Sequence, residues 1–158
     1  MMKKSWKILL FWVLAAEGVG ALAGLISRNA TKMYEMMAQK PPLSPPGWLF
    51  PVVWGILYAL MGIGAGIVTL APPSKERSRS LNLMVSQLIV NFFWPLLFFN
   101  AGAYGFSLLW LVILLALVVW MTLSFRTVSP LAAAMQIPYI FWLSFAAYLN
   151  AGVWYLNR

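Results

Sequence analysis

The chain of 158 residues contains neither cysteine nor histidine. Disulfides, thiolate nucleophiles, zinc sites and every catalytic triad that uses an imidazole or a thiol are therefore excluded. Acidic residues are also scarce, and the three are Glu17, Glu35 and Glu76. Because only Glu17 lies inside a long apolar segment, a carboxylate pair or a multi-carboxylate metal cage has no obvious place to form. We expect no bound metal and no cofactor.

Charged residues make up only 9% of the chain, against roughly a quarter in soluble domains, and 63% of the residues are hydrophobic. Five apolar segments are long enough to cross a hydrocarbon core of about 30 Å as helices. They lack the strict alternation of barrel strands. The sequence therefore predicts an all-α integral membrane protein, a five-helix transmembrane bundle forming one domain (1–158), with helices at residues 8–26, 48–70, 81–99, 106–125 and 131–155.

The net charge of +8 comes from basic residues that lie at the ends of these segments, in residues 1–7, 28–40 and 75–79. This pattern is typical of orientation in a membrane with anionic headgroups, and it argues against nucleic-acid binding. It favours a cytoplasmic N-terminus with the C-terminus on the other side. The first segment resembles a signal peptide, but Glu17 interrupts its apolar run, so we interpret it as a helix that stays.

The connection at residues 27–47 is the only one long enough to serve as a lid. Its second half, Pro41-Pro42-Leu-Ser-Pro45-Pro46, lacks four backbone donors and holds fixed φ angles, which predicts a stiff extended strap. Pro51 then suits the first turn of the next helix. The alternative to a lid is an ordinary helix N-terminus. Pro95 and Pro138 fall inside predicted helices and predict kinks.

Three helices each carry an aromatic and a polar or small residue on one face. An amide in hydrocarbon is costly unless it faces a partner or a cavity. The stripes indicate either interhelical packing or a pocket suited to a large planar apolar ligand. They consist of Trp54, Tyr58 and Gly62; Gln87, Asn91 and Trp94; and Trp142, Ala146 and Asn150 with Tyr139 beside them.

Glu17 shares a face of the first segment with Gly20 and Gly24. We expect its carboxyl group to be protonated or hydrogen-bonded to an amide such as Gln87 or Asn91. A proton relay through it lacks a second membrane carboxylate. The glycine pair is the first candidate for a homodimer contact, and the rival interpretation is packing within one subunit.

Taken together, four stretches across the second to fifth segments resemble the TspO/MBR family, the tryptophan-rich sensory proteins that include the translocator proteins or peripheral benzodiazepine receptors. The first segment matches only loosely. The stretches are Lys40-Pro-x-x-x-Pro-Pro-x-Trp48; Pro51-Val-Val-Trp-Gly-Ile-Leu-Tyr58 with Met61-Gly62; Gln87-Leu-Ile-Val-Asn91-x-x-Trp-Pro95 with Phe98-Phe99; and Val128-Ser-Pro-Leu-Ala-Ala133 followed by Pro138-Tyr139-x-x-Trp142-x-x-Phe-Ala146-x-x-Leu149-Asn150.

The resemblance implies a five-helix bundle, commonly dimeric, whose pocket binds porphyrins such as protoporphyrin IX and is closed by the first loop. In animal members it also implies cholesterol and isoquinoline carboxamide drugs. It implies a bacterial cell membrane, or a mitochondrial outer membrane if the source is eukaryotic. The positions that match the family's ligand contacts are Tyr34, Pro45, Trp54, Asn91, Trp94, Tyr139, Trp142 and Ala146.

The chain departs from the family pattern at three places. Met33-Tyr34 stands where the family usually has Trp-Tyr, so one aromatic wall of the lid is missing. Ala151 replaces the tyrosine of the cholesterol motif, and the loose pattern Val153-x-Tyr155-x-x-Arg158 is out of register, so we do not predict cholesterol binding. Asn82 and Ser86 occupy the positions where some relatives have a pair of small residues in the third segment. The dimer contact can therefore lie on the first or on the third segment.

Three functions remain open from the sequence. The first is a receptor or carrier for tetrapyrroles, with a role in tetrapyrrole homeostasis or stress signalling. The second is an enzyme-like activity in which light-excited porphyrin is oxidatively degraded, with Trp54 and Trp142 as electron donors. The third is a membrane scaffold that packs through its glycine faces.

Overall fold

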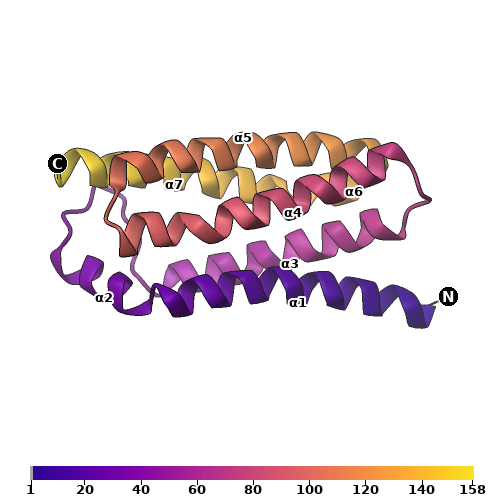
Figure 1. Ribbon diagram of the computed structural model, residues 1–158, viewed down its shortest axis with the longest axis horizontal. Helices are drawn as coiled ribbons and strands as arrows, with labels where there is room; N and C mark the ends of the chain where they lie inside the picture. Colours follow the sequence, from indigo (N-terminus) through magenta and orange to yellow (C-terminus); the bar gives the residue numbers. More distant parts are fainter. Residues whose placement is uncertain (1) are drawn as a thin grey trace.

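A computed structural model describes residues 2–158, which form helices and no strand. Figure 1 shows the long helices side by side in one elongated bundle, with the N- and C-termini at opposite ends. Five helical stretches are long and apolar enough to cross a membrane, which confirms the predicted all-α, multi-pass membrane fold. The elements are α1 (Met2–Ile26), α2 (Arg28–Met37), α3 (Leu49–Leu70), α4 (Lys75–Pro95), the π-helix η1 (Leu96–Asn100), α5 (Tyr104–Val128), α6 (Pro130–Ala134) and α7 (Ile137–Leu156).

Helix α1 packs along α3, α4 packs on α5, and α5 packs on α7. Glycines let the α1–α3 pair approach closely, because a Cβ atom on Gly62 would lie 2.6 Å from the backbone nitrogen of Val13. A Cβ atom on Gly20 would collide with the ring of Tyr58. Gly20 therefore packs inside the subunit, as the rival interpretation held, and does not present an outward surface to a second copy.

The two helix-internal prolines behave differently. Pro95 ends α4, and the chain continues as the π-helical turn η1. Pro138 was expected to kink a continuous fifth helix, and this expectation is wrong. The segment is broken between α6 and α7, and Pro138 lies in the first turn of α7, where its missing N–H leaves no hydrogen bond unmade. Pro51 occupies the first turn of α3, as predicted.

The loop at residues 27–47 has two halves. The first half is the helix α2, which the sequence did not predict, and it lies at the end of the bundle where the C-terminus also lies (Figure 1). The second half has no helix or strand, but it is not extended throughout as expected: the chain turns at Pro42 and Leu43, where Leu43 has a φ of 70°, and the Ser44 hydroxyl donates to the carbonyl of Pro41 at 2.7 Å.

The strap is fastened to α7. Gln39 exchanges two hydrogen bonds with the side chain of Asn157, at 3.0 and 2.8 Å. The hydroxyl of Tyr148 donates to the carbonyl of Pro42 at 2.8 Å, and Pro41 is buried against Gly152. The strap therefore spans from α2 across to α7 before the chain enters α3.

Candidate ligand-binding cavity

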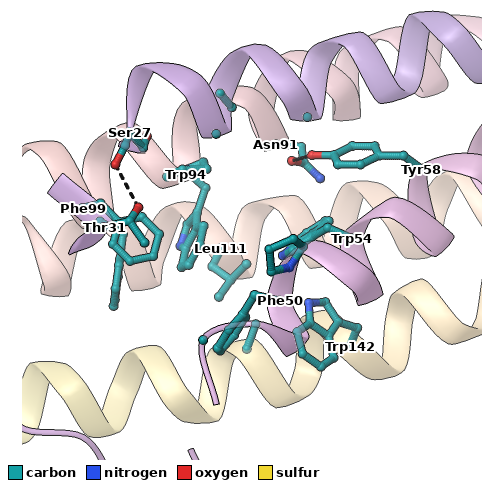
Figure 2. Close-up of a pocket in the computed structure, with 18 of the residues that line it drawn as sticks. Ser27, Thr31, Phe50, Trp54, Tyr58, Asn91, Trp94, Phe99, Leu111 and Trp142 are labelled. Atoms are coloured by element: carbon teal, nitrogen blue, oxygen red, sulfur yellow. Dashed lines mark hydrogen bonds between the residues drawn. The ribbon is translucent and has the colours of Figure 1, made fainter. Parts of the chain in front are cut away.

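A cavity of about 450 Å³ lies at the end of the bundle that carries α2, within the range of small-molecule sites. Helices α1, α3, α4, α5 and α7 form its walls, and α2 contributes to the covering end. Figure 2 shows Tyr58 and Asn91 meeting at one end and Ser27, Thr31 and Phe99 at the other, with Trp94 between them.

Aromatic rings supply most of the cavity wall. Trp54 lies against Tyr58, with ring centroids 5.4 Å apart, and Phe50 meets Trp142 edge to face at 5.7 Å. These rings come from α3 and α7 and lie together in Figure 2. Opposite them, Trp94 stacks on Phe98 at 4.9 Å. Such walls offer π faces at low conformational cost, which suits a flat apolar ligand.

Beside the aromatic walls lies a chain of hydrogen bonds that joins α3, α4 and α7. The Tyr58 hydroxyl donates to Asn91 Oδ1 at 2.7 Å, and Asn91 Nδ2 donates to the Tyr139 hydroxyl at 2.6 Å. Tyr139 in turn donates to Gln87 Oε1 at 2.7 Å. Each buried polar group thus finds a partner, as an apolar surrounding demands. Asn91 faces the cavity with one N–H and one lone pair still free.

A second amide joins the helices nearer the covered end of the cavity. Asn150 Oδ1 accepts from the indole nitrogen of Trp94 at 3.1 Å and from the Ser107 hydroxyl at 3.2 Å. Its Nδ2 donates to the carbonyl of Tyr104 at 2.9 Å. Because the indole of Trp94 is held by this bond, its ring is fixed in the cavity wall.

Tyr34 carries the covering segment onto the bundle. Its ring meets Phe98 and Phe99 edge to face, each at 5.2 Å between centroids, and the Lys40 amine lies 5.5 Å from its ring centroid. Burial raises the pKa of Tyr34 to about 12, with smaller contributions from Tyr104 and Glu35. The closed position therefore favours the neutral phenol.

Several polar groups of the lining have no hydrogen-bond partner among residues 2–158. They are the hydroxyl of Ser27, which is 1% exposed, the indole nitrogen of Trp142, and the carboxyl group of Glu17. The Ser27 backbone carbonyl, in contrast, accepts from Thr31 Oγ1 at 2.9 Å, the dashed line in Figure 2. The cavity thus holds unused donors and acceptors within an aromatic surrounding.

Six of the eight site residues expected from the sequence line the cavity. Two do not. Pro45 lies half-buried in the strap, and Tyr139 is fully buried behind Trp54, with ring centroids 6.1 Å apart. Tyr139 positions Asn91 and has no surface on the cavity. The six that line it are Tyr34, Trp54, Asn91, Trp94, Trp142 and Ala146.

The sequence interpretation missed part of the lining. Ser27 continues the face of α1 that carries Glu17, Gly20 and Gly24, so helical spacing could have found it. The expected bond from Glu17 to Gln87 or Asn91 is absent among the described residues, because Tyr58, Tyr139 and methionine sulfurs occupy those amides. Phe50 and Thr31 gave no signal that separates them from helix packing.

A sequence profile described as the TspO/MBR family matches residues 12–156. The translocator protein of Ovis aries is 39% identical over 122 residues, which cover 76% of this chain and 72% of the relative. The tryptophan-rich protein TspO of Chlorobaculum tepidum is 34% identical over 145 residues, covering 88% and 89%. The protein CrtK of Rhodobacter capsulatus is 35% identical over 147 residues, covering 92% and 90%.

Proposed function

Because the chain belongs to the TspO/MBR family, we propose that it is a membrane receptor or carrier that binds porphyrins of the protoporphyrin IX type and similar planar apolar ligands. Residues 1–158 act as one domain in this function. Binding in the cavity serves tetrapyrrole homeostasis or stress signalling. The ligand stacks on the indoles of Trp54 and Trp142 and is covered by Tyr34.

The observation that carries this proposal is the composition of the cavity wall. Trp54, Trp94 and Trp142 come from three different helices and converge on one space, and α2 contributes Thr31, Tyr34 and Glu35 to its lining at the bundle end. Helix packing alone does not require a space of about 450 Å³ between them. Close-packed interiors hold few voids larger than a water molecule.

The test is a titration of purified protein with protoporphyrin IX in the dark, followed by tryptophan quenching. Replacing Trp54, Asn91 or Trp142 by Ala is expected to weaken binding severalfold, because each aromatic contact contributes on the order of 0.5–1.5 kcal/mol beyond area burial. Trp120→Ala is the control, since Trp120 is exposed on α5 outside the cavity. If all three variants are folded and bind as tightly as the parent, the cavity is not the site.

A light-dependent degradation of bound porphyrin, with dioxygen as oxidant, is the second candidate. Trp54 contacts the rings of both Tyr58 and Tyr139, and the indole nitrogen of Trp142 is buried without a partner among the described residues. In this candidate function these indoles donate electrons to the excited ligand. Trp54→Phe and Trp142→Phe keep a π face, so binding is expected to fall modestly while light-dependent loss of the Soret band falls far more. Equal losses in both measurements contradict the degradation.

We further propose a homodimer, formed through the outer face of α4. Gly20 is occupied by Tyr58 and Gly24 lines the cavity, so α1 does not present the glycine pair outward. On α4, Asn82 and Ser86 are exposed one turn apart, and an amide facing lipid is costly unless another helix meets it. A protein that binds no porphyrin but forms this dimer would instead be the membrane scaffold.

A further inference from the structure

A second, open groove lies between α4 and α5, at the end of the bundle that carries the N-terminus and the α3–α4 loop (Figure 1). Lys75 and Arg79 line it, and neither Glu76 nor any other acidic residue of residues 2–158 does so. We propose that this groove binds an anionic phospholipid, with the phosphate on Lys75 and Arg79 and an acyl chain along α5. This inference goes beyond the proposed function, because no residue of the groove lines the cavity.

Arg79 is held over the groove by a buried pair of hydroxyl groups. Its Nε donates to Ser124 Oγ at 3.1 Å, and Ser124 Oγ lies 2.7 Å from Ser80 Oγ. Both serines are buried, so the bond fixes the guanidinium against α5. Its two terminal nitrogens have no hydrogen bond or ion pair among residues 2–158. A guanidinium whose outer donors are free suits a phosphate, which it binds through two parallel hydrogen bonds.

The groove changes from charged to apolar with depth. The membrane span of α4 begins at Lys75, and Arg79 is level with Ser124 of α5, to which it bonds. Trp120 and Leu117 lie one and two turns deeper and line the groove, and Trp120 is 55% exposed. The charges therefore lie at the level of the headgroups and the apolar wall lies at the level of the acyl chains. A phospholipid has the same order of charge and hydrocarbon, and basic pockets between transmembrane helices recognise anionic headgroups.

Two polar side chains lie between the charged end and the apolar wall. Ser78 and Asn82 line the groove one turn apart, and neither side chain has a hydrogen bond among residues 2–158. An exposed amide at the depth of a membrane span is costly without a partner. The ester carbonyls of a phospholipid lie just below its phosphate and can accept from Asn82 Nδ2. The dimer contact proposed above continues to Ser86, one turn deeper, so the lipid lies at the edge of that contact.

The test uses two lipids that share brominated acyl chains and differ in headgroup, phosphatidylglycerol and phosphatidylcholine. Bromine quenches a tryptophan that the chain contacts, and the difference between the parent and Trp120→Phe isolates the quenching of Trp120. Both lipids are titrated into the full-length protein in detergent micelles. The test variant is Lys75→Gln combined with Arg79→Gln. The matched control is Lys3→Gln combined with Lys4→Gln, which removes the same charge from the same end of the bundle outside the groove.

The parent is expected to bind phosphatidylglycerol on the order of tenfold more tightly than phosphatidylcholine, since each basic residue near the surface favours an anionic lipid. The Lys75→Gln and Arg79→Gln double variant is expected to bind both lipids equally. The control is expected to keep the preference of the parent. Lys75→Gln alone is expected to lower the preference severalfold, and because this side chain has no hydrogen bond or ion pair among residues 2–158, the test remains valid if the double variant does not fold.

Four results would overturn the site. The first is a preference that survives in the double variant. The second is an equal loss in the Lys3→Gln and Lys4→Gln control, which would assign the preference to the charge of the whole bundle end. The third is equal quenching in the parent and in Trp120→Phe, which would place the chain away from α5. The fourth is displacement of the lipid by glycerol 1-phosphate at equal concentration, which would show a site for soluble phosphates.

Discussion

The hydroxyl of Tyr139 is the point where the cavity floor and the helix bundle are joined. It accepts from Asn91 on one side and donates to Gln87 on the other, and it is fully buried. Removing one partner from such a chain leaves buried amide groups unpaired, at about 1–3 kcal/mol each. Asn91, which lines the cavity, is therefore held in place by Tyr139, which does not line it.

We expect Tyr34 to make the release of a bound ligand depend on pH. Closure raises its pKa to about 12, against roughly 10 for a free phenol. The contribution of Tyr34 to closure is therefore fully present below about pH 10 and is lost as the pH rises toward 12. We expect the protoporphyrin IX off-rate to increase between pH 9 and pH 11.5 in stopped-flow displacement. Tyr34→Phe removes the titrating group, and an equal increase in that variant contradicts this origin.

Among single residues, the sequence predicted those that helical periodicity places on a common helix face. Trp54, Asn91 and Trp142 were found because each lies on a helix face with other polar or aromatic residues. Tyr139 shares the spacing but lies one layer deeper, and helical spacing gives direction without depth. For Glu17 the sequence left two possibilities, a protonated carboxyl group or an amide partner, and it cannot show that Tyr58 and Tyr139 already occupy those amides.

Among the elements, the α1–α3 pair depends on glycines, and Gly62 makes the closest backbone contact of them. A Cβ atom on Gly62 meets the backbone of Val13, which cannot move without separating the helices. Gly62→Ala is expected to destabilise the bundle by about 2 kcal/mol or more, as overpacking in a core does. The measurement is unfolding in mixed detergent micelles. Gly18→Ala is the control, since nothing lies within 4 Å of its Cβ position. An equal loss of stability in Gly18→Ala would contradict the α1–α3 contact as the cause.

If the loop at residues 27–47 closes over a bound ligand, the four prolines of the strap limit the conformational entropy that the loop loses. Replacing Pro41, Pro42, Pro45 and Pro46 by Ala frees the backbone by about 0.4–1 kcal/mol at each compatible position. We expect faster release of protoporphyrin IX, by about fivefold or more. Pro72 and Pro73, replaced by Ala in the loop at the opposite end, serve as controls. An unchanged off-rate in the quadruple variant would contradict the hypothesis that this loop is a lid.

Two elements were not predictable from local sequence. α2 has no side-chain cap hydrogen bond, and although it is amphipathic its short length hides this in the sequence; its place is fixed by the ring contacts of Tyr34 with Phe98 and Phe99. The break before α7 depends on Gln136, whose amide donates to the carbonyls of Leu60 and Ala132 at 3.2 Å each. Both features arise from tertiary contacts, which override local propensity. The five long apolar segments needed no such information.

For the whole molecule, the proposed dimer gives α4 the contact between subunits and leaves α1 to line the cavity. Ser86→Trp is expected to give monomers in detergent that still bind protoporphyrin IX, because a bulky side chain holds the α4 faces apart. Gly24→Leu is expected to keep the dimer and weaken binding, since Gly24 lines the cavity. Light scattering and the dark titration measure both. Leu109→Trp on the exposed side of α5 is the control. If Gly24→Leu gives monomers, the dimer contact lies on α1 and the proposed contact on α4 is wrong.

The fastening of the strap to α7 has a mechanical consequence. Asn157 and Tyr148 hold Gln39 and Pro42, so a change in the tilt of α7 pulls on the segment that covers the cavity. Transmembrane helices tilt when the thickness of the hydrocarbon core changes. The residence time of a bound macrocycle is therefore expected to depend on acyl-chain length in nanodiscs. Asn157→Ala combined with Tyr148→Phe removes side-chain hydrogen bonds between the strap and α7. In this double variant the residence time of the macrocycle is expected not to depend on bilayer thickness.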